Sequence, residues 1–136
     1  MLSRKLSRVR IKVVNQTRDK VLASHADVAT SFASRLVGLM GRRALAFGDG
    51  LHIAPCNSIH TFLMKIPIDA VFLDKQLKVV KVCGAMVPWR ISSLVWGADS
   101  VLELPAGTCF ASGTLEGDQL VFASLEVPLT GENTVA

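Results

Sequence analysis

The chain has 136 residues, of which 50% are hydrophobic and 19% are charged, with a formal net charge of +4. A chain of this size makes one ordinary domain, and its apolar content excludes an intrinsically disordered protein. Because no apolar run reaches the roughly 18 residues of a transmembrane helix, we expect no membrane span.

The N-terminus is the basic part of the chain. Residues 1–20 hold seven Lys or Arg residues and a single acid, Asp19. We expect a basic arm over residues 1–8, one domain over 9–127 and a flexible polar tail over 128–136. No aromatic or glycine-rich binding element accompanies these charges, so nucleic acid is not an expected partner. Basic residues also interrupt the apolar stretch that a signal peptide needs, which favours a cytoplasmic protein.

The first half of the chain predicts two strands and a helix. Residues 9–13 alternate apolar and basic side chains, which is typical of a half-buried strand. Residues 16–19 are typical of a turn, and residues 20–26 can return as a second strand. Apolar residues near 3.6-residue spacing predict one short helix near residues 31–40. We expect chain reversals at Gly41 and at the glycine pair of residues 48–50.

The second half is dominated by strand patterns. Strands are expected over residues 59–64, 68–73, 77–83, 101–104 and 119–125, with short turns between them. Helices do not alternate with these strands, so the fold class is mainly β, an antiparallel sandwich or a small barrel. Residues 84–99 interrupt the pattern as a long flap loop that contains both tryptophans, Trp89 and Trp96.

Potential metal ligands recur every four residues in one segment: His52, Cys56, His60 and Met64. On an extended strand four residues span roughly 13 Å, which is too far for one ion to bridge. We therefore predict no metal and no cofactor. The three cysteines, Cys56, Cys83 and Cys109, lack C-x-x-C spacing, which indicates free thiols in a reducing compartment.

The same segment offers a nucleophile and a pocket rim. Cys56 could attack with His60 as its base, and Asp69 could orient the imidazole. If Met64 pairs with Ile68 across a hairpin, His60 and Asp69 point to opposite faces of the sheet. Asp69 would then bond to Thr61 or to the backbone.

Several other polar residues complete the set of candidates. Asn57, Ser58, His60 and Thr61 suit the rim of a small pocket with a few directed hydrogen bonds. Arg35 and Glu103 are charges in apolar surroundings, and they either pair with each other or reach a site.

Five motifs in order along the chain carry a family resemblance. The chain resembles domain-of-unknown-function family 192, an uncharacterised bacterial and archaeal family, over roughly residues 9–125. The resemblance implies a compact, mainly β fold and no established enzyme activity. The pair His60-Thr61 is similar to a His-Thr subgroup of the family. The matching motifs are Arg35–Arg42, Gly50–Leu51, Ile59–Asp74, Val101–Gly107 and Gly117–Asp118.

Three functional hypotheses remain open. The leading one is an accessory or ligand-binding domain with a polar pocket around Cys56–Met64 and Asp69, covered by the flap. The second is a small hydrolase or transferase that uses Cys56 or His60. The third is a protein–protein interaction module that docks a partner through the Trp89–Trp96 loop. The expected partner is a small molecule or a protein.

Overall fold

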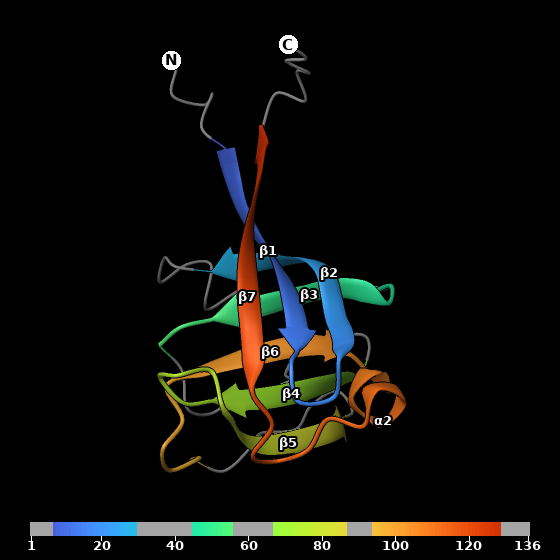
Figure 1. Cartoon of the computed structure of the whole chain (residues 1–136), viewed down its shortest axis with the longest axis vertical. Helices are drawn as coiled ribbons and strands as arrows, with labels where there is room; N and C mark the ends of the chain where they lie inside the picture. The colour runs from blue at the N-terminus through green and yellow to red at the C-terminus, as the bar shows by residue number, and fades with distance from the viewer. Residues whose placement is uncertain (1–6, 30–44, 56–66, 87–93, 129–136) are drawn as a thin grey trace.

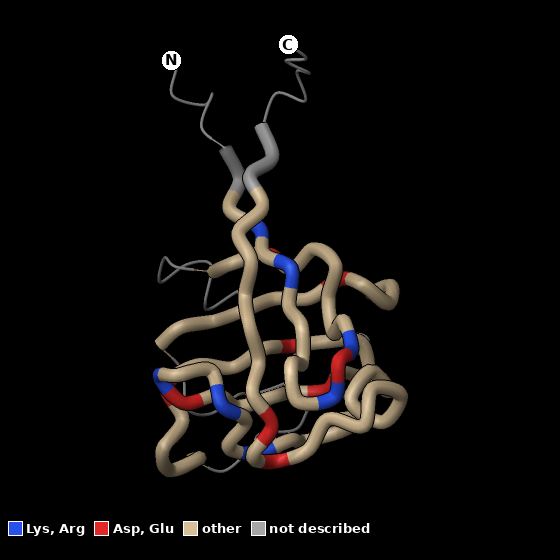
Figure 2. The backbone as a smooth tube through the Cα atoms, in the orientation of Figure 1, with Lys and Arg blue, Asp and Glu red and all other residues tan. Residues whose placement is uncertain are grey.

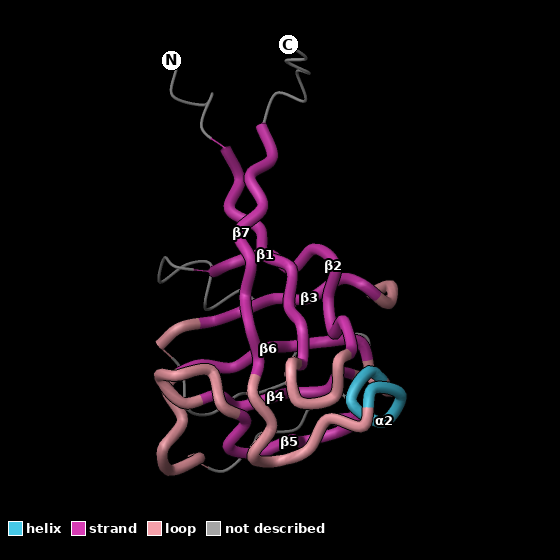
Figure 3. The backbone as a smooth tube through the Cα atoms, viewed as in Figure 1, coloured by secondary structure: helices cyan, strands magenta, loops and turns pink. Residues whose placement is uncertain are grey.

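The computed structural model describes residues 7–29, 45–55, 67–86 and 94–128 (Figure 1). These ranges hold seven strands and one short helix, which Figure 3 distinguishes by colour. The strands are β1 Ser7–Asn15, β2 Lys20–Ala29, β3 Gly48–Ile53, β4 Ile68–Leu73, β5 Val79–Met86, β6 Ser100–Pro105 and β7 Leu120–Pro128, and the helix is α2 Thr108–Ser112.

The seven strands form one sheet in the order β5-β4-β6-β3-β2-β1-β7. Neighbouring strands are antiparallel except β2 and β3, which run parallel, so the sheet is mixed. The predicted mainly β class is confirmed. The outer strands approach each other at one bridge, Lys78 to Gln119, and the sheet does not close into a barrel.

The centre of the sheet is buried on both faces. All residues of β4 and β6 are buried, and their side chains alternate between two apolar clusters. One cluster packs Val71 and Leu102 against Ile11 of β1 and Leu120 of β7, because the sheet folds over itself (Figure 1). The other cluster holds Phe72, with its neighbours, on the opposite face. Positions next to each other along β4 or β6 therefore lie in different surroundings.

Helix α2 begins and ends at glycines with left-handed backbone angles. Gly107 precedes it with φ 97°, and Gly113 follows it with φ 72°. Positive φ favours glycine, so these two residues fix the bounds of the helix. In the sequence, only a short turn was expected between the strands at 101–104 and 119–125. The helix predicted near residues 31–40 lies outside the described residues.

Two local features differ from those expected. The reversal expected at residues 48–50 lies slightly earlier, where the backbone N–H of Asp49 donates to the carbonyl oxygen of Ala46, and β3 already begins at Gly48, which pairs with Ala23 of β2. The hairpin considered between Met64 and Ile68 would need a free edge of β4, but Ile68 pairs with Met86 of β5 and with Pro105 of β6, and Met64 itself lies outside the described residues.

The flap and the ends of the chain are described in part. Residues 84–86 of the predicted flap belong to β5, and residues 94–99 form a loop, while 87–93 lie outside the described ranges. Most of the predicted arm and tail lie outside them as well. In the part of the chain that is described, no helix is long and apolar enough to cross a membrane.

Candidate functional site

The structure describes three of the residues predicted to form a site. Asp69, Glu103 and Trp96 are described, and the structure does not bring them together. Because Ala70 pairs with Glu103 in the sheet, Asp69 and Glu103 point to opposite faces. Trp96 lies in a loop with 86% of its surface exposed. The other predicted site residues lie outside the described ranges: Arg35, Cys56, Asn57, Ser58, His60, Thr61 and Trp89.

Asp69 fastens two neighbouring elements together. Its side chain on β4 is buried, with 1% of the residue exposed. The Oδ1 atom accepts the backbone N–H of Ala85 at 2.7 Å, and Oδ2 accepts the backbone N–H of Cys109 at 2.9 Å. Asp69 therefore ties the end of β5 to the first turn of α2. Of the two bonds predicted for Asp69, the structure shows the one to the backbone.

An open cavity of about 570 Å³ lies over these two fastened elements. Its apolar lining includes Val82, Ala85, Phe110 and Leu115, and its backbone lining includes three glycines. We call this cavity the Asp69 pocket. Its volume lies within the range of small-molecule sites, roughly 300–1,000 Å³.

The rim of the Asp69 pocket is held by a polar network. Arg18 donates from Nε and Nη2 to the two carboxylate oxygens of Asp118, at 2.9 and 3.1 Å. Buried Asn15 donates from Nδ2 to Asp118 and to Thr114, both at 3.0 Å. The hydrogen bond from Arg18 is the main cause that lowers the pKa of Asp118 to about 2. The network fixes Arg18 and the chain after α2 at the edge of the pocket.

The surroundings of Cys109 in the pocket lining disfavour its thiolate form. Burial is the main cause that raises its pKa to about 12, and the nearby Asp69 carboxylate raises it further. A nucleophilic cysteine requires the thiolate, which this environment disfavours. The Asp69 pocket can therefore bind a molecule, but its cysteine is not built for covalent catalysis.

Glu103 is a buried carboxyl group on the other face of the sheet. Only 3% of the residue is exposed, and it pairs with Leu51 of β3 and Ala70 of β4. Burial raises the pKa of Glu103 to about 8. Within the described part of the chain, its Oε1 atom has no hydrogen-bond partner. The carboxyl group is therefore mostly protonated at neutral pH.

The half-buried side chain of His52 holds a second buried polar atom without a partner in the described part of the chain. Its Nε2 atom has no hydrogen-bond partner among the residues described, and its ring packs edge-on against Phe122 at 4.8 Å. Burial lowers the pKa of His52, which favours the neutral imidazole. Groups of three or more potential metal ligands do not occur within residues 7–29, 45–55, 67–86 and 94–128.

An exposed hydrogen-bonded chain joins β2 to the start of β3. Asp49 Oδ1 lies 2.7 Å from His25 Nε2, and His25 Nδ1 lies 3.0 Å from Ser24 Oγ. When the proton of a neutral His25 is on Nε2, facing the carboxylate, Nδ1 can accept the hydroxyl proton of Ser24, which also has the carbonyl oxygen of Gly48 as an acceptor at 3.5 Å. These three residues were not predicted to lie together, because Asp49 is 24 residues away from His25 in the sequence.

Known proteins support the resemblance noted in the sequence. The profile of domain-of-unknown-function family 192, described as "Uncharacterized ACR", matches residues 13–122. The chain belongs to this family.

The chain is also similar to archaeal proteins called UPF0127 protein. The one from Pyrococcus horikoshii is 35% identical over 98 residues, which cover 70% of this chain and 84% of the relative. The one from Thermococcus sibiricus is 32% identical over 112 residues, which cover 79% and 72%. The predicted His-Thr subgroup within family 192 stays a prediction, because His60 and Thr61 lie outside the described residues.

Two crystal structures share the fold. A protein of unknown function from Novosphingobium aromaticivorans has a TM-score of 0.72 at 20% identity and covers 82% of this chain and 83% of its own. A protein from Sinorhizobium meliloti, described as a candidate transcription regulator, has a TM-score of 0.74 at 22% identity and covers 87% and 95%. At these identities the likeness establishes the fold of this family 192 member and nothing about its activity.

The residues that build the Asp69 pocket carried little signal in the sequence. Arg18 lay in a predicted turn, and Phe110 and Leu115 had no assigned role. Gly107 and Gly113 were the available signal, since two glycines that bracket five residues are typical of helix ends.

Proposed function

We propose that this family 192 member is a ligand-binding domain and that the Asp69 pocket is its binding site. One observation carries the proposal: an apolar cavity of about 570 Å³ whose two walls are tied together by a buried carboxylate. A pocket that is already formed loses little conformational entropy when a ligand binds. Of the site predicted from the sequence, the proposed pocket retains Asp69. The contribution of Cys56–Met64 stays a prediction.

A variant that fills the pocket tests the proposal. A Cβ atom at Gly84 would lie 3.8 Å from Asp69 Oδ1, which is an ordinary contact, so a side chain fits there and occupies the cavity. We expect Gly84→Leu to abolish the fluorescence increase that the amphiphilic anionic dye anilinonaphthalene sulfonate shows on binding. Ala123→Leu introduces a leucine at an exposed position on β7 and should leave dye binding unchanged. Equal dye binding by wild type and both variants would refute the pocket as the binding site.

Acyl transfer is a second candidate function, favoured by the chain from Asp49 through His25 to Ser24. A carboxylate that orients an imidazole, which in turn accepts a hydroxyl proton, is the arrangement that activates a serine. Hydrolysis of p-nitrophenyl acetate that is lost in Ser24→Ala and His25→Ala would support it. Hydrolysis that persists in both variants would refute acyl transfer by Ser24 and His25. The hypothesis built on Cys56 and His60 lies outside the described residues.

The predicted interaction module retains one described feature, the exposed Trp96, and stays a prediction. We also propose a cytoplasmic location, because both described cysteines, Cys83 and Cys109, are free. Cell fractionation tests this location, and recovery of the protein outside the cytoplasm would contradict it.

A further inference from the structure

A β-bulge turns Ser24 and His25 to the same side of β2. Ala23 pairs with Gly48 and His25 pairs with Asp49, so Ser24 is an extra residue in the register of β2 with β3. Consecutive strand residues normally alternate between the two faces of a sheet, yet Ser24 and His25 are both exposed. Bulges are common beside active sites, where they re-aim a side chain. This bulge allows two neighbours in sequence to lie side by side, with Ser24 Oγ 3.0 Å from His25 Nδ1.

The neighbours of the Ser24 hydroxyl leave it both positioned and accessible. A Cβ atom at Gly48 would lie 2.9 Å from Ser24 Oγ, so the glycine leaves the space that the hydroxyl occupies. Asp49 Oδ2 accepts the backbone N–H of Ala46 at 3.2 Å, which holds the carboxylate whose Oδ1 faces His25. Because Ser24 and His25 are exposed, a substrate can reach both side chains.

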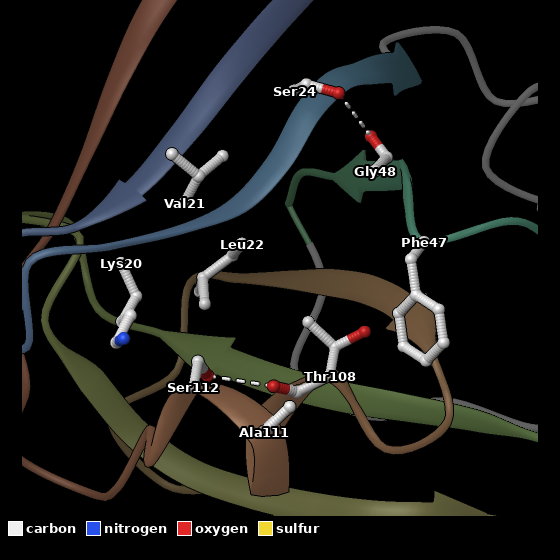
Figure 4. A pocket seen from close by; sticks show the side chains of 9 residues that line it. All are labelled: Lys20, Val21, Leu22, Ser24, Phe47, Gly48, Thr108, Ala111 and Ser112. Carbon is white, nitrogen blue, oxygen red and sulfur yellow. Dashed lines mark hydrogen bonds between the residues drawn. The ribbon is translucent and has the colours of Figure 1, made fainter.

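An apolar pocket begins at Ser24. The pocket has a volume of about 220 Å³, and Figure 4 shows Ser24 at one end of it. Its apolar lining comes from Val21 and Leu22 of β2, from Phe47 and from Ala111 of α2. We call this cavity the Phe47 pocket.

The two hydroxyl groups that α2 contributes to the Phe47 pocket are bonded within the protein. Thr108 donates from Oγ1 to the carbonyl oxygen of Pro105 at 2.8 Å. Ser112 donates from Oγ to the carbonyl oxygen of Thr108, also at 2.8 Å. Since these hydroxyl protons are used inside the fold, the pocket presents an apolar body with the Ser24 hydroxyl at its end.

Charge does not select the occupant of the Phe47 pocket. Lys20 is the charged residue of its described lining, and Asp19 beside it in the sequence carries the opposite charge. Figure 2 shows both signs in the connection between β1 and β2. An uncharged, apolar group is therefore the occupant that fits this lining.

The size of the Phe47 pocket limits the occupant. An apolar cavity of about 150 Å³ holds one benzene molecule, so at the same volume per carbon atom a cavity of about 220 Å³ holds a chain of about eight carbons. An alkyl chain in the pocket, ending in a carbonyl group at Ser24, would match both the apolar lining and the hydroxyl.

We propose that the Phe47 pocket holds the acyl chain of an ester and that Ser24 receives the acyl group. The substrates are esters of unbranched apolar acids with about six to eight carbons. The juxtaposition that carries the proposal is that one residue, Ser24, both ends the chain from Asp49 through His25 and lines the apolar pocket. The inference rests on acyl transfer, the second candidate function, and names its substrate.

The reaction balances with water as the second reactant. Ser24 Oγ bonds to the carbonyl carbon of the ester while its proton moves to His25 Nδ1, and Asp49 stabilises the imidazolium through Nε2. The ester C–O bond then breaks, and the alcohol leaves with the proton from His25. Water attacks the acyl-serine, one of its protons passes through His25 to Ser24 Oγ, and the carboxylic acid is released. The acyl chain occupies the Phe47 pocket in both steps.

A series of p-nitrophenyl esters tests the acyl pocket. The kcat/KM of the full chain is compared for the acetate, butyrate, hexanoate and octanoate esters. Each CH₂ group that enters the pocket should raise kcat/KM roughly twofold to fourfold, because its burial stabilises the bound transition state. Mass spectrometry should show one added acyl group on wild type and none on Ser24→Ala. Equal kcat/KM values for all four esters would overturn the inference.

Two matched leucine variants locate the acyl chain. Ala111→Leu fills the Phe47 pocket from α2 and should lower kcat/KM for the octanoate ester roughly tenfold, with the acetate value changed by less than about twofold. Ala123→Leu makes the same substitution on β7 and should leave all four esters unchanged. Phe47→Ala removes a wall of the pocket and should also lower the octanoate value more than the acetate value. Each variant is first checked for an unchanged unfolding midpoint.

The outcomes separate the acyl pocket from acyl transfer itself. Acetate hydrolysis that requires Ser24 and His25, but falls equally for acetate and octanoate in Ala111→Leu and Phe47→Ala, would keep acyl transfer and overturn the acyl pocket. A rise with chain length that persists in Ser24→Ala would place the reaction elsewhere and overturn the inference. No hydrolysis of any ester by wild type would refute both.

Discussion

Two buried carboxyl groups on neighbouring central strands have opposite surroundings. Asp69 accepts two backbone N–H bonds and holds the pocket beside α2, whereas the Oε1 atom of Glu103 finds no partner among the described residues. A buried charge is costly unless it is paired or hydrogen-bonded. The hydrogen bonds of Asp69 therefore stabilise the positions of β5 and α2, whereas the ionised form of buried Glu103 destabilises the folded state. Burial by itself does not tell these two roles apart, but hydrogen-bond partners do.

The largest effect should come from removing the Asp69 fastening. Asp69→Ala leaves two buried backbone N–H groups without acceptors, so we expect a loss of about 4 kcal/mol in the free energy of unfolding, measured by urea denaturation. Asp74 offers a matched control, because its Oδ1 also accepts two backbone N–H groups, from Gln76 and Lys78, in an exposed turn. Asp74→Ala should cost about 1 kcal/mol, since water replaces the lost acceptor. Equal losses would erase the distinction between the two carboxylates.

Replacing Glu103 should stabilise the protein, whereas replacing Asp69 should destabilise it. Its folded-state pKa of about 8 lies above the unfolded value of 4.5, so the folded state holds an extra proton between these pH values. Stability therefore falls as the pH rises through this interval. Glu103→Gln removes the ionisation and should be more stable than wild type by about 2 kcal/mol at pH 8, with no such gain at pH 4. Thermal unfolding across this pH range, with the exposed Glu116→Gln as control, measures it. A destabilised variant at pH 8 would show that the Glu103 carboxylate has a stabilising partner.

Removing the Asp118 charge from the polar network at the pocket rim should have a smaller effect on stability. Asp118→Asn should lower the free energy of unfolding by about 1–2 kcal/mol at neutral pH, because Arg18 is partly exposed and solvent weakens the pair. The pKa of Asp118 is lowered from 3.8 to about 2, so its stabilisation is present above pH 3.8 and lost as the pH falls toward 2. The difference between variant and wild type should therefore shrink in acid, as followed by urea denaturation. A difference that is constant with pH would mean that the Asp118 charge is irrelevant.

The smallest effect concerns the start of α2. Gly107 has φ 97° and space for a Cβ atom, so Gly107→Ala should cost about 1 kcal/mol through backbone strain alone. Dye binding to the Asp69 pocket should weaken with it, because the helix start is part of the pocket wall. Gly84→Ala, where φ is not positive, is the control and should be nearly neutral in urea denaturation. An unchanged Gly107→Ala variant would show that α2 tolerates another starting geometry.

Much of the sheet could be predicted from the sequence, because alternation along residues 9–13 and the apolar runs at 68–73 and 101–104 are local signals. The parallel pairing of β2 with β3 is a tertiary choice that no local pattern encodes. The same limit applies to Asp69, whose bonding partners lie 16 and 40 residues further along the chain. They are backbone N–H groups, which every residue except proline possesses, so residue types could not reveal them. The buried state of Glu103 was anticipated from its leucine neighbours.

Amide chemical-shift mapping during titration with anilinonaphthalene sulfonate tests the central claim most directly. The account predicts that the largest shifts fall on Gly84, Cys109, Phe110 and Leu115, around the pocket that Asp69 holds in shape. Shifts confined to the loop at residues 94–99, or no shifts at any amide, would contradict it.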